Sequence, residues 1–185
     1  DYAANFKEFL SEKPEDKPFC FWYGGFEPHR SYEVGEGDRA GKNPDDIDVP
    51  SYLPDDEVVR NDLNDYAYEI EWFDKHLGQM IDKLEEMDEL ENTLIIVTSD
   101  NGMPFPRVKG QMYEQDFHLP MALCWKQQTG CNRKVEDLVS FIDIAPTFLE
   151  AAGVEIPSQM EGKSLMNIIK SNKSGQIDEQ RNQVY

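Results

Sequence analysis

The stretch Leu94-Ile-Ile-Val-Thr-Ser-Asp-Asn-Gly102 decides how the rest of the chain is interpreted. Its first half, from Leu94 to Val97, is an apolar run typical of a strand buried on both faces. The run is followed closely by Asp100 and Asn101, and Gly102 allows a sharp turn directly behind them. Ligands of α/β sheets gather at the carboxyl ends of strands, and carboxylate and amide oxygens suit Ca²⁺ or Mg²⁺.

A plain turn is the alternative at this position. Asp, Asn and Gly all favour turns, and from spacing alone the tripeptide favours a turn over a metal site. Lys109 lies eight residues after Asn101 and is within reach of an anion on such a metal, although a surface lysine is the default. His29 follows another apolar run and is a candidate proton donor or anion ligand, although a loop histidine need not be functional.

Strands and helices alternate along the chain, which predicts an α/β fold with a mostly parallel sheet flanked by helices. A long helix from Asp55 should bury one apolar stripe and leave the acids of its opposite face in solvent. A long irregular loop is expected over 31–54. The remaining expected elements are a helix ending at Leu10, strands at 19–23, 93–98 and 119–125, and a helix near 145–152 closed by Gly153.

The composition limits the partners. The 185 residues include 37 acidic and 18 basic side chains, for a net charge of −19, which disfavours nucleic acid and anionic membranes. We find no apolar run long enough to cross a membrane, and the first residues do not resemble a signal peptide. Three cysteines form no disulfide framework, and pairing of Cys124 with Cys131 is left open.

Taken as an ordered set, several segments resemble the sulfatase family, and within it the N-sulfatase (sulfamidase) branch. The resemblance covers nearly the whole chain and is far more specific than any one segment. The segments are Pro18–Arg30, Asn92–Pro106, Lys109–Glu114, Leu119-Pro120, Val139–Leu149, Ala152–Val154 and Glu161–Leu165.

The resemblance implies an alkaline-phosphatase-like α/β fold and hydrolysis of sulfate esters or sulfamates. By position, Asp100 and Asn101 match two calcium ligands of that family. His29 matches the histidine that contacts the sulfate and the leaving-group oxygen, and Lys109 matches the basic residue on the sulfate. The sulfamidase branch has arginine in place of Lys109, so specificity for N-sulfate stays open. His118 is a possible substrate-side contact.

The nucleophile motif of the family is missing from this sequence. The family makes its formylglycine nucleophile from a Cys/Ser-x-Pro-x-Arg motif, and this sequence has none. We therefore expect residues 1–185 to be the central to C-terminal part of the large catalytic domain. The nucleophile segment, the further calcium-binding aspartates and the C-terminal subdomain would lie outside it. The chain alone should bind calcium weakly or not at all and should not turn over substrate.

Two other functions remain open. A phosphatase or phosphodiesterase of the same superfamily is one, although Asn101 stands where those relatives usually have a histidine for Zn²⁺ or Mn²⁺. A protein that binds sulfated glycans without catalysis is the other. The expected partner is a sulfated carbohydrate, and the resemblance suggests a periplasmic, secreted or lysosomal-type location. The sugar, its linkage and the oligomeric state do not follow from the sequence.

Overall fold

The structure is a computed structural model that describes residues 1–128 and 130–184. Two compact units make up the chain. Unit 1 comprises Asp1–Asp88 and Ser99–Leu119, and unit 2 comprises Glu89–Thr98 and Pro120–Tyr185. Each unit therefore contains two separate segments of the sequence.

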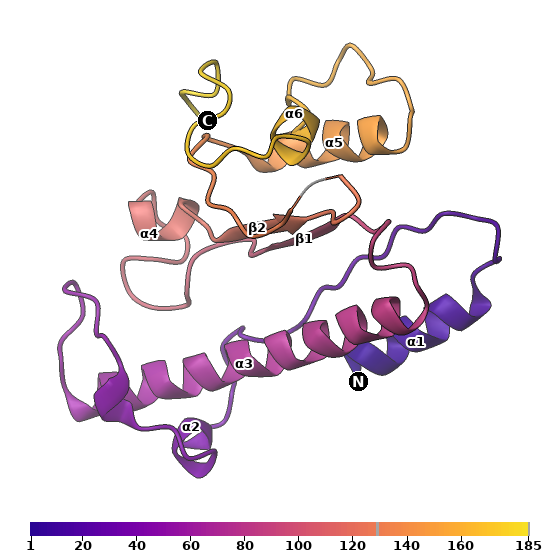
Figure 1. The fold of residues 1–185 in the computed structure, drawn as a ribbon. Coiled ribbons are helices and arrows are strands. Elements are labelled where there is room, and N and C mark those ends of the chain that lie inside the picture. Colours follow the sequence, from indigo (N-terminus) through magenta and orange to yellow (C-terminus); the bar gives the residue numbers. More distant parts are fainter. Residues whose placement is uncertain (129, 185) are drawn as a thin grey trace. The chain divides into compact units, whose positions relative to one another are not determined.

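Unit 1 is built on the long helix α3 (Glu57–Glu86), against which α1 (Tyr2–Glu12) and α2 (Glu36–Arg39) pack (Figure 1). The 3₁₀ turn η1 (Pro44–Asp46) and the short helix α4 (Glu114–Phe117) complete it. The Asp56 side chain caps α3 by accepting a hydrogen bond from the Val59 amide at 2.9 Å. The expected loop over 31–54 thus holds two short helical turns.

The apolar stripe predicted for α3 is confirmed over part of its length, because Leu63, Met80 and Leu84 are buried. Ile70, by contrast, is 43% exposed. Two acids of α3, Asp65 and Glu69, are buried rather than exposed to solvent. The Asp65 carboxylate accepts the amides of Gly35 and Gly37, both at 2.8 Å, and so holds α2 against α3.

Residues 19–23 are extended, but they do not form the predicted strand with two buried faces. Trp22 is 84% exposed and Cys20 is exposed, whereas the residues between and beside them are partly buried. The inward side chains pack on aromatic rings of the helices, as Phe21 does on Phe6 at 4.8 Å and Tyr23 on Phe73 at 4.5 Å between ring centroids. One packed face is therefore enough to hold this segment.

Unit 2 contains the strands β1 (Ile95–Thr98) and β2 (Met121–Cys124), which pair with Ile95 opposite Cys124. The pair is antiparallel, so these two strands differ from the parallel pairing expected for most of the sheet. A parallel pair needs a crossover, usually through a full helix. The connection from residue 99 to 120 contains only the four-residue α4.

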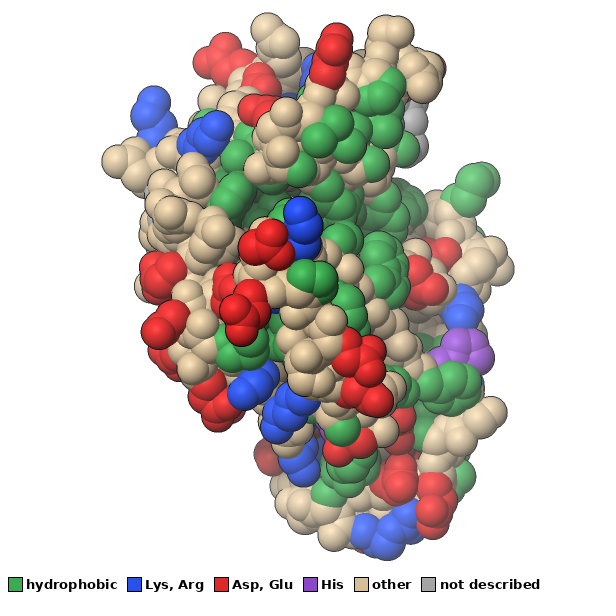
Figure 2. All heavy atoms as spheres, turned by 90° about the vertical axis from the view of Figure 1, so that its right-hand side faces the viewer, with side chains coloured by type: hydrophobic (Ala, Val, Ile, Leu, Met, Phe, Trp, Pro, Cys, Tyr) green, Lys and Arg blue, Asp and Glu red, His purple; other side chains and the backbone are tan. Residues whose placement is uncertain are grey.

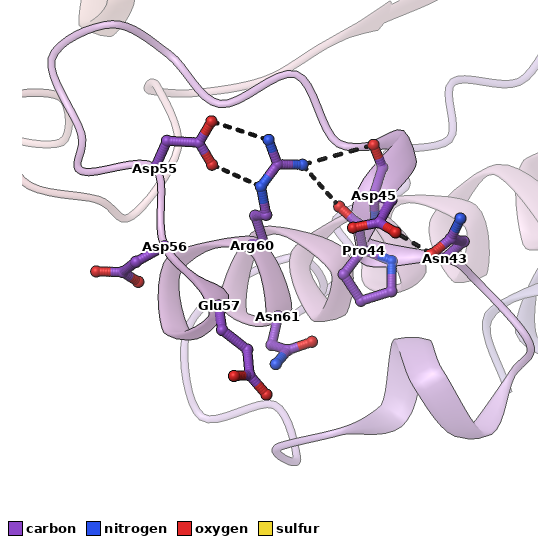
Figure 3. Close-up of a pocket in the computed structure, with 8 residues that line it drawn as sticks. All are labelled: Asn43, Pro44, Asp45, Asp55, Asp56, Glu57, Arg60 and Asn61. Carbon is purple, nitrogen blue, oxygen red and sulfur yellow. Dashed lines mark hydrogen bonds and ion pairs between the residues drawn. The ribbon is translucent and has the colours of Figure 1, made fainter.

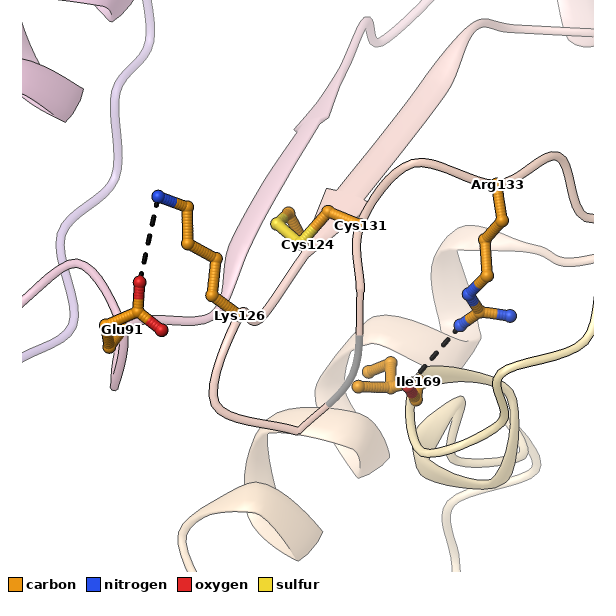
Figure 4. The surroundings of a disulfide bond; sticks show 6 residues. All are labelled: Glu91, Cys124, Lys126, Cys131, Arg133 and Ile169. Atoms are coloured by element: carbon orange, nitrogen blue, oxygen red, sulfur yellow. Dashed lines mark hydrogen bonds and ion pairs between the residues drawn. A yellow bond between two sulfur atoms is a disulfide. The ribbon is translucent and has the colours of Figure 1, made fainter.

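The core of unit 2 forms where α6 (Met166–Ile169) and the preceding Leu165 pack together and against partly buried side chains, among them Leu94, directly before β1, and Leu123 of β2. The 3₁₀ turn η2 (Phe141–Asp143) leads into α5 (Ile144–Ala151), close to the helix predicted from the sequence. Cys124 at the end of β2 is disulfide-bonded to Cys131 (Figure 4), which answers the pairing left open above.

The surface reflects the acidic composition. Figure 2 shows one face on which Asp and Glu side chains are widely spread among fewer Lys and Arg side chains. Among the described residues, no helix combines the length and apolar character needed to cross a lipid bilayer.

Candidate functional site

All five residues predicted for the site lie in unit 1. Asp100 and Asn101 come two and three residues after the last residue of β1, on a turn that continues to the buried Phe105 and Val108. Asp100 is exposed and Asn101 is half-buried. The sequence therefore places a carboxylate and an amide side by side on a turn whose following residues are anchored in the interior.

The Asn101 side chain is oriented by its own turn. Its amide nitrogen donates to the Gly102 carbonyl at 2.8 Å, and the Ser99 hydroxyl donates to the Asn101 carbonyl at 3.2 Å. This leaves the side-chain oxygen of Asn101 and the carboxylate of Asp100 as hard oxygen donors suited to Ca²⁺. Among the described residues, no cluster of three or more His, Cys, Asp or Glu could hold a metal ion.

Asp116 ties this turn to the segment that carries Lys109. One carboxylate oxygen accepts the Gly102 amide at 3.0 Å, and the other accepts the Gln111 amide at 3.0 Å. Gly102, next to Asn101, and Gln111, two residues after Lys109, thus bind the same carboxylate. Sequence reasoning missed Asp116, because nothing in its spacing separates it from the other acids around α4.

Position 102 requires glycine because the neighbouring atoms leave no space for a Cβ atom. A Cβ atom on this residue would lie 2.2 Å from the Gln115 carbonyl oxygen and 2.5 Å from a methyl carbon of Val108. The glycine expected from the sequence to allow a sharp turn therefore also lets two backbone segments approach closely.

His29 lies in the loop that follows the extended segment. Its backbone amide donates to the Phe26 carbonyl at 2.9 Å, and its ring packs on the Phe26 ring at 5.3 Å between centroids. The ring nitrogen Nδ1 is 2.9 Å from the Arg30 carbonyl oxygen. Because a carbonyl oxygen only accepts, Nδ1 carries the proton and Nε2 is the nitrogen available for chemistry.

Arg30, the next residue, connects the His29 loop to two other segments. Its guanidinium makes a bidentate pair with Asp62 of α3, at 2.7 and 2.6 Å, and its Nε donates to the Pro104 carbonyl at 2.9 Å. The Tyr32 hydroxyl donates to the same Asp62 carboxylate at 2.9 Å. Burial, followed by the hydrogen bond to Asp62, raises the pKa of Tyr32 above its ordinary value.

Lys109 and His118 are on the surface. Lys109 is exposed. His118 follows α4, and its Nδ1 lies 2.6 Å from a carboxylate oxygen of Glu114 one turn earlier, with 75% of the histidine side chain exposed. Both side chains are therefore accessible to a ligand that approaches this part of unit 1.

The larger of the two cavities described is elsewhere in unit 1. It has a volume of about 410 Å³, and Asn43, Pro44, Asp45, Asp55, Asp56, Glu57, Arg60 and Asn61 line it (Figure 3). Arg60 makes a bidentate pair with Asp55, in which Nε and Nη2 donate to the two carboxylate oxygens at 2.5 and 2.9 Å. This hydrogen bonding lowers the pKa of the Asp55 carboxyl. None of the predicted site residues lines this cavity, whose one cation is already paired.

Known proteins resemble the chain in sequence and in structure. The sulfatase family model matches residues 1–154. An ulvan-active sulfatase of Formosa agariphila is 29% identical over 71% of the chain, and the human N-sulphoglucosamine sulphohydrolase is 27% identical over 82%. A solved structure of a protein in complex with its substrate D-glucosamine-2-N,6-O-disulfate superposes with a TM-score of 0.58, at 28% identity over 69% of the chain.

The chain spans only part of these relatives. It corresponds to 22% of the ulvan-active sulfatase, 34% of the human protein and 27% of the solved chain. The match to the family model nevertheless covers most of the 185 residues. Together with the fold shared with the solved structure, it establishes that the chain belongs to the sulfatase family.

Proposed function

We propose that the chain is part of the catalytic domain of a sulfatase that hydrolyses sulfate esters or sulfamates of a carbohydrate. The observation that carries the proposal is the shared carboxylate of Asp116, which bonds the turn of Asp100 and Asn101 to the segment of Lys109. This arrangement supports a cation site and an anion-binding lysine held on one scaffold. It suits a sulfate group bound between a metal ion and a positive side chain.

Each residue has a distinct part in the proposed reaction. Asp100 and Asn101 would hold Ca²⁺, and the bound ion would supply positive charge to the sulfate oxygens. Lys109 would bind the same oxygens as a point charge. His29 keeps Nδ1–H on the Arg30 carbonyl, so a second proton, carried on Nε2, would be the one passed to the leaving oxygen or nitrogen. His118 would contact the substrate, oriented by Glu114.

The nucleophile is proposed to be a formylglycine supplied by residues outside this chain. Residues 1–185 are accordingly proposed to be one part of the large catalytic domain, with the C-terminal subdomain also outside. The disulfide between Cys124 and Cys131 supports a location in an oxidising compartment, such as a periplasmic, secreted or lysosomal one.

A sulfated amino sugar is the proposed substrate class. Two of the similar proteins are named for glucosamine sulfates, the human sulphohydrolase and the solved complex. The test offers an N-sulfated and an O-sulfated amino sugar to the full-length protein and measures sulfate release from each. The substrate that releases sulfate shows which group is removed. Release from neither substrate, with Ca²⁺ present, would contradict the proposal.

Asn101→Ala tests the site within that experiment. Loss of a metal ligand should lower kcat/KM at least about 100-fold, with part of the loss recovered at high Ca²⁺ concentration. Asn132→Ala is the matched control, because Asn132 is exposed in unit 2. Equal activity of the two variants would show that Asn101 is not part of the site.

A further inference from the structure

The Arg30 side chain is held from three directions. Its two terminal nitrogens bind the two oxygens of Asp62, its Nε binds the Pro104 carbonyl, and its guanidinium carbon lies 4.6 Å from the centroid of the Phe105 ring. Phe105 is only 6% exposed. The guanidinium therefore joins α3, the loop of His29 and the turn that follows Asn101 within unit 1.

The contacts of Arg30 also determine the orientation of His29. The Arg30 carbonyl accepts the proton of His29 Nδ1, so the place of the Arg30 backbone sets the direction of the imidazole. The side chain of the same residue holds that backbone to Pro104, four residues after Asp100. Displacement of Arg30 would thus move the imidazole relative to Asp100 and Asn101.

Stability alone is a weak explanation for this arrangement. The side chains of Arg30 and Asp62 are 41% and 32% exposed. Ion pairs at this level of exposure contribute little to folding. A planar fork with five donors is, however, well suited to bind the Asp62 carboxylate and the Pro104 carbonyl at once, and a lysine would keep the charge without the fork.

We propose that Arg30 is a positioning residue that holds the His29 imidazole in register with the Asp100–Asn101 turn, with Asp62 as its anchor. The inference rests on the function proposed above, and it assigns Arg30 no contact with substrate.

The first test compares Arg30→Met and Arg30→Lys in the full-length protein, with Arg39→Met as the control. Arg39 forms an exposed ion pair with Glu33 in the same unit, at 2.7 Å. Misplacement of a reacting group costs up to about 100-fold in rate. We expect kcat to fall about 30- to 100-fold in both Arg30 variants, with KM changed less than about threefold, and no change in the control.

The comparison with lysine separates geometry from charge. If Arg30→Lys retained the full kcat, the charge alone would be sufficient and the proposal would be wrong. If kcat per folded molecule were unchanged in Arg30→Met, Arg30 would have a purely structural role, which would also overturn it.

The second test does not require activity. The amides of Phe105 and Val108 donate to the carbonyls of Met103 and Phe105 within the turn that Arg30 holds. Hydrogen exchange at these amides should be at least about tenfold faster in Arg30→Met, and unchanged in Arg39→Met and in the last turn of α3. Unchanged exchange at 105 and 108 would overturn the proposal. A wild-type protein that releases no sulfate would contradict only the proposed function.

Discussion

Two arginine–aspartate pairs of the same chemistry lie in very different surroundings. In unit 2, Arg181 binds Asp143 at 2.8 Å, and these side chains are 3% and 8% exposed. In unit 1, Arg30 binds Asp62 at 2.6 Å with both side chains about a third or more exposed. Both guanidiniums also donate to backbone carbonyls, Arg181 to those of Lys163 and Ser164.

The difference lies in what each pair holds. The Asp143 carboxylate also accepts the amides of Ser140 and Lys163, so the buried pair joins η2, the loop after α5 and the segment of Arg181 into the interior of unit 2. The exposed pair holds loops that carry candidate site residues. Identical partners therefore stabilise the fold in one unit and position side chains in the other.

The largest expected effect concerns the buried pair. Arg181→Met leaves Asp143 buried without its cation, so the free energy of unfolding should fall by about 3–5 kcal/mol. The exposed counterpart Arg30→Met should cost about 1 kcal/mol or less. Urea denaturation of the two variants measures both values. Equal losses would mean that burial does not distinguish the two pairs.

The next effect tests how far unit 2 depends on its cross-link. The disulfide between Cys124 and Cys131 closes a loop with a sequence separation of seven residues. Cys131→Ser should lower the free energy of unfolding by about 2–3 kcal/mol, because the unfolded chain regains the entropy of the open loop. Thermal unfolding under non-reducing conditions measures the loss.

Cys20→Ser in unit 1 is the matched control for this substitution. Cys20 is a free, exposed cysteine, so its replacement should change stability by less than about 0.5 kcal/mol. A reducing agent should abolish the difference between the wild-type protein and Cys131→Ser. A difference that survives full reduction would assign the effect to packing at Cys131.

The smallest expected effect concerns the pH dependence of stability and compares the buried acids of the two units. Asp137 and Asp143 in unit 2 accept backbone amides, whereas Glu69 in unit 1 faces other acids. Burial, followed by a hydrogen bond to Glu36 and the charges of Glu36, Glu27 and Asp65, raises the pKa of Glu69 from 4.5 to about 7. The folded protein then binds more protons than the unfolded chain between these values.

Glu69 should therefore contribute full stability below pH 4.5, and this contribution should be lost as pH rises through about 7. Glu69→Gln removes the dependence, so the variant should be about 1–2 kcal/mol more stable than the wild type at about pH 8 and similar at about pH 4. Urea denaturation across this range measures it. Glu85→Gln, an exposed substitution on the same helix, should leave the pH profile unchanged.

The elements that could be predicted from the sequence are those with a local signal. The helix α3 follows from its apolar period and from the acids at its start, and α5 from Pro146 and Gly153 at its two ends. The two strands of unit 2 follow from short apolar runs. Their antiparallel pairing does not, because direction depends on the path of the connecting chain rather than on the strand residues.

The non-local part of the candidate site was not predictable. Asp100, Asn101 and His29 stand out by residue type and by their place after apolar runs. Asp116 and Asp62 do not, because their importance comes from amides and a guanidinium brought to them by folding. For the same reason, the burial of Asp65 and Glu69 could not be predicted from the apolar period of α3. That period shows where apolar side chains pack, and it does not show which acids become buried.

Gly102 has a consequence for the natural variation of this gene. Every amino-acid replacement at this codon adds a Cβ atom, which the Gln115 carbonyl leaves no room for at 2.2 Å. A missense change here should therefore be as damaging when it yields alanine as when it yields a large residue. The turn beside Asn101 can evolve only if the opposing backbone at 115–116 moves with it, so substitutions at the two places should arise together across lineages.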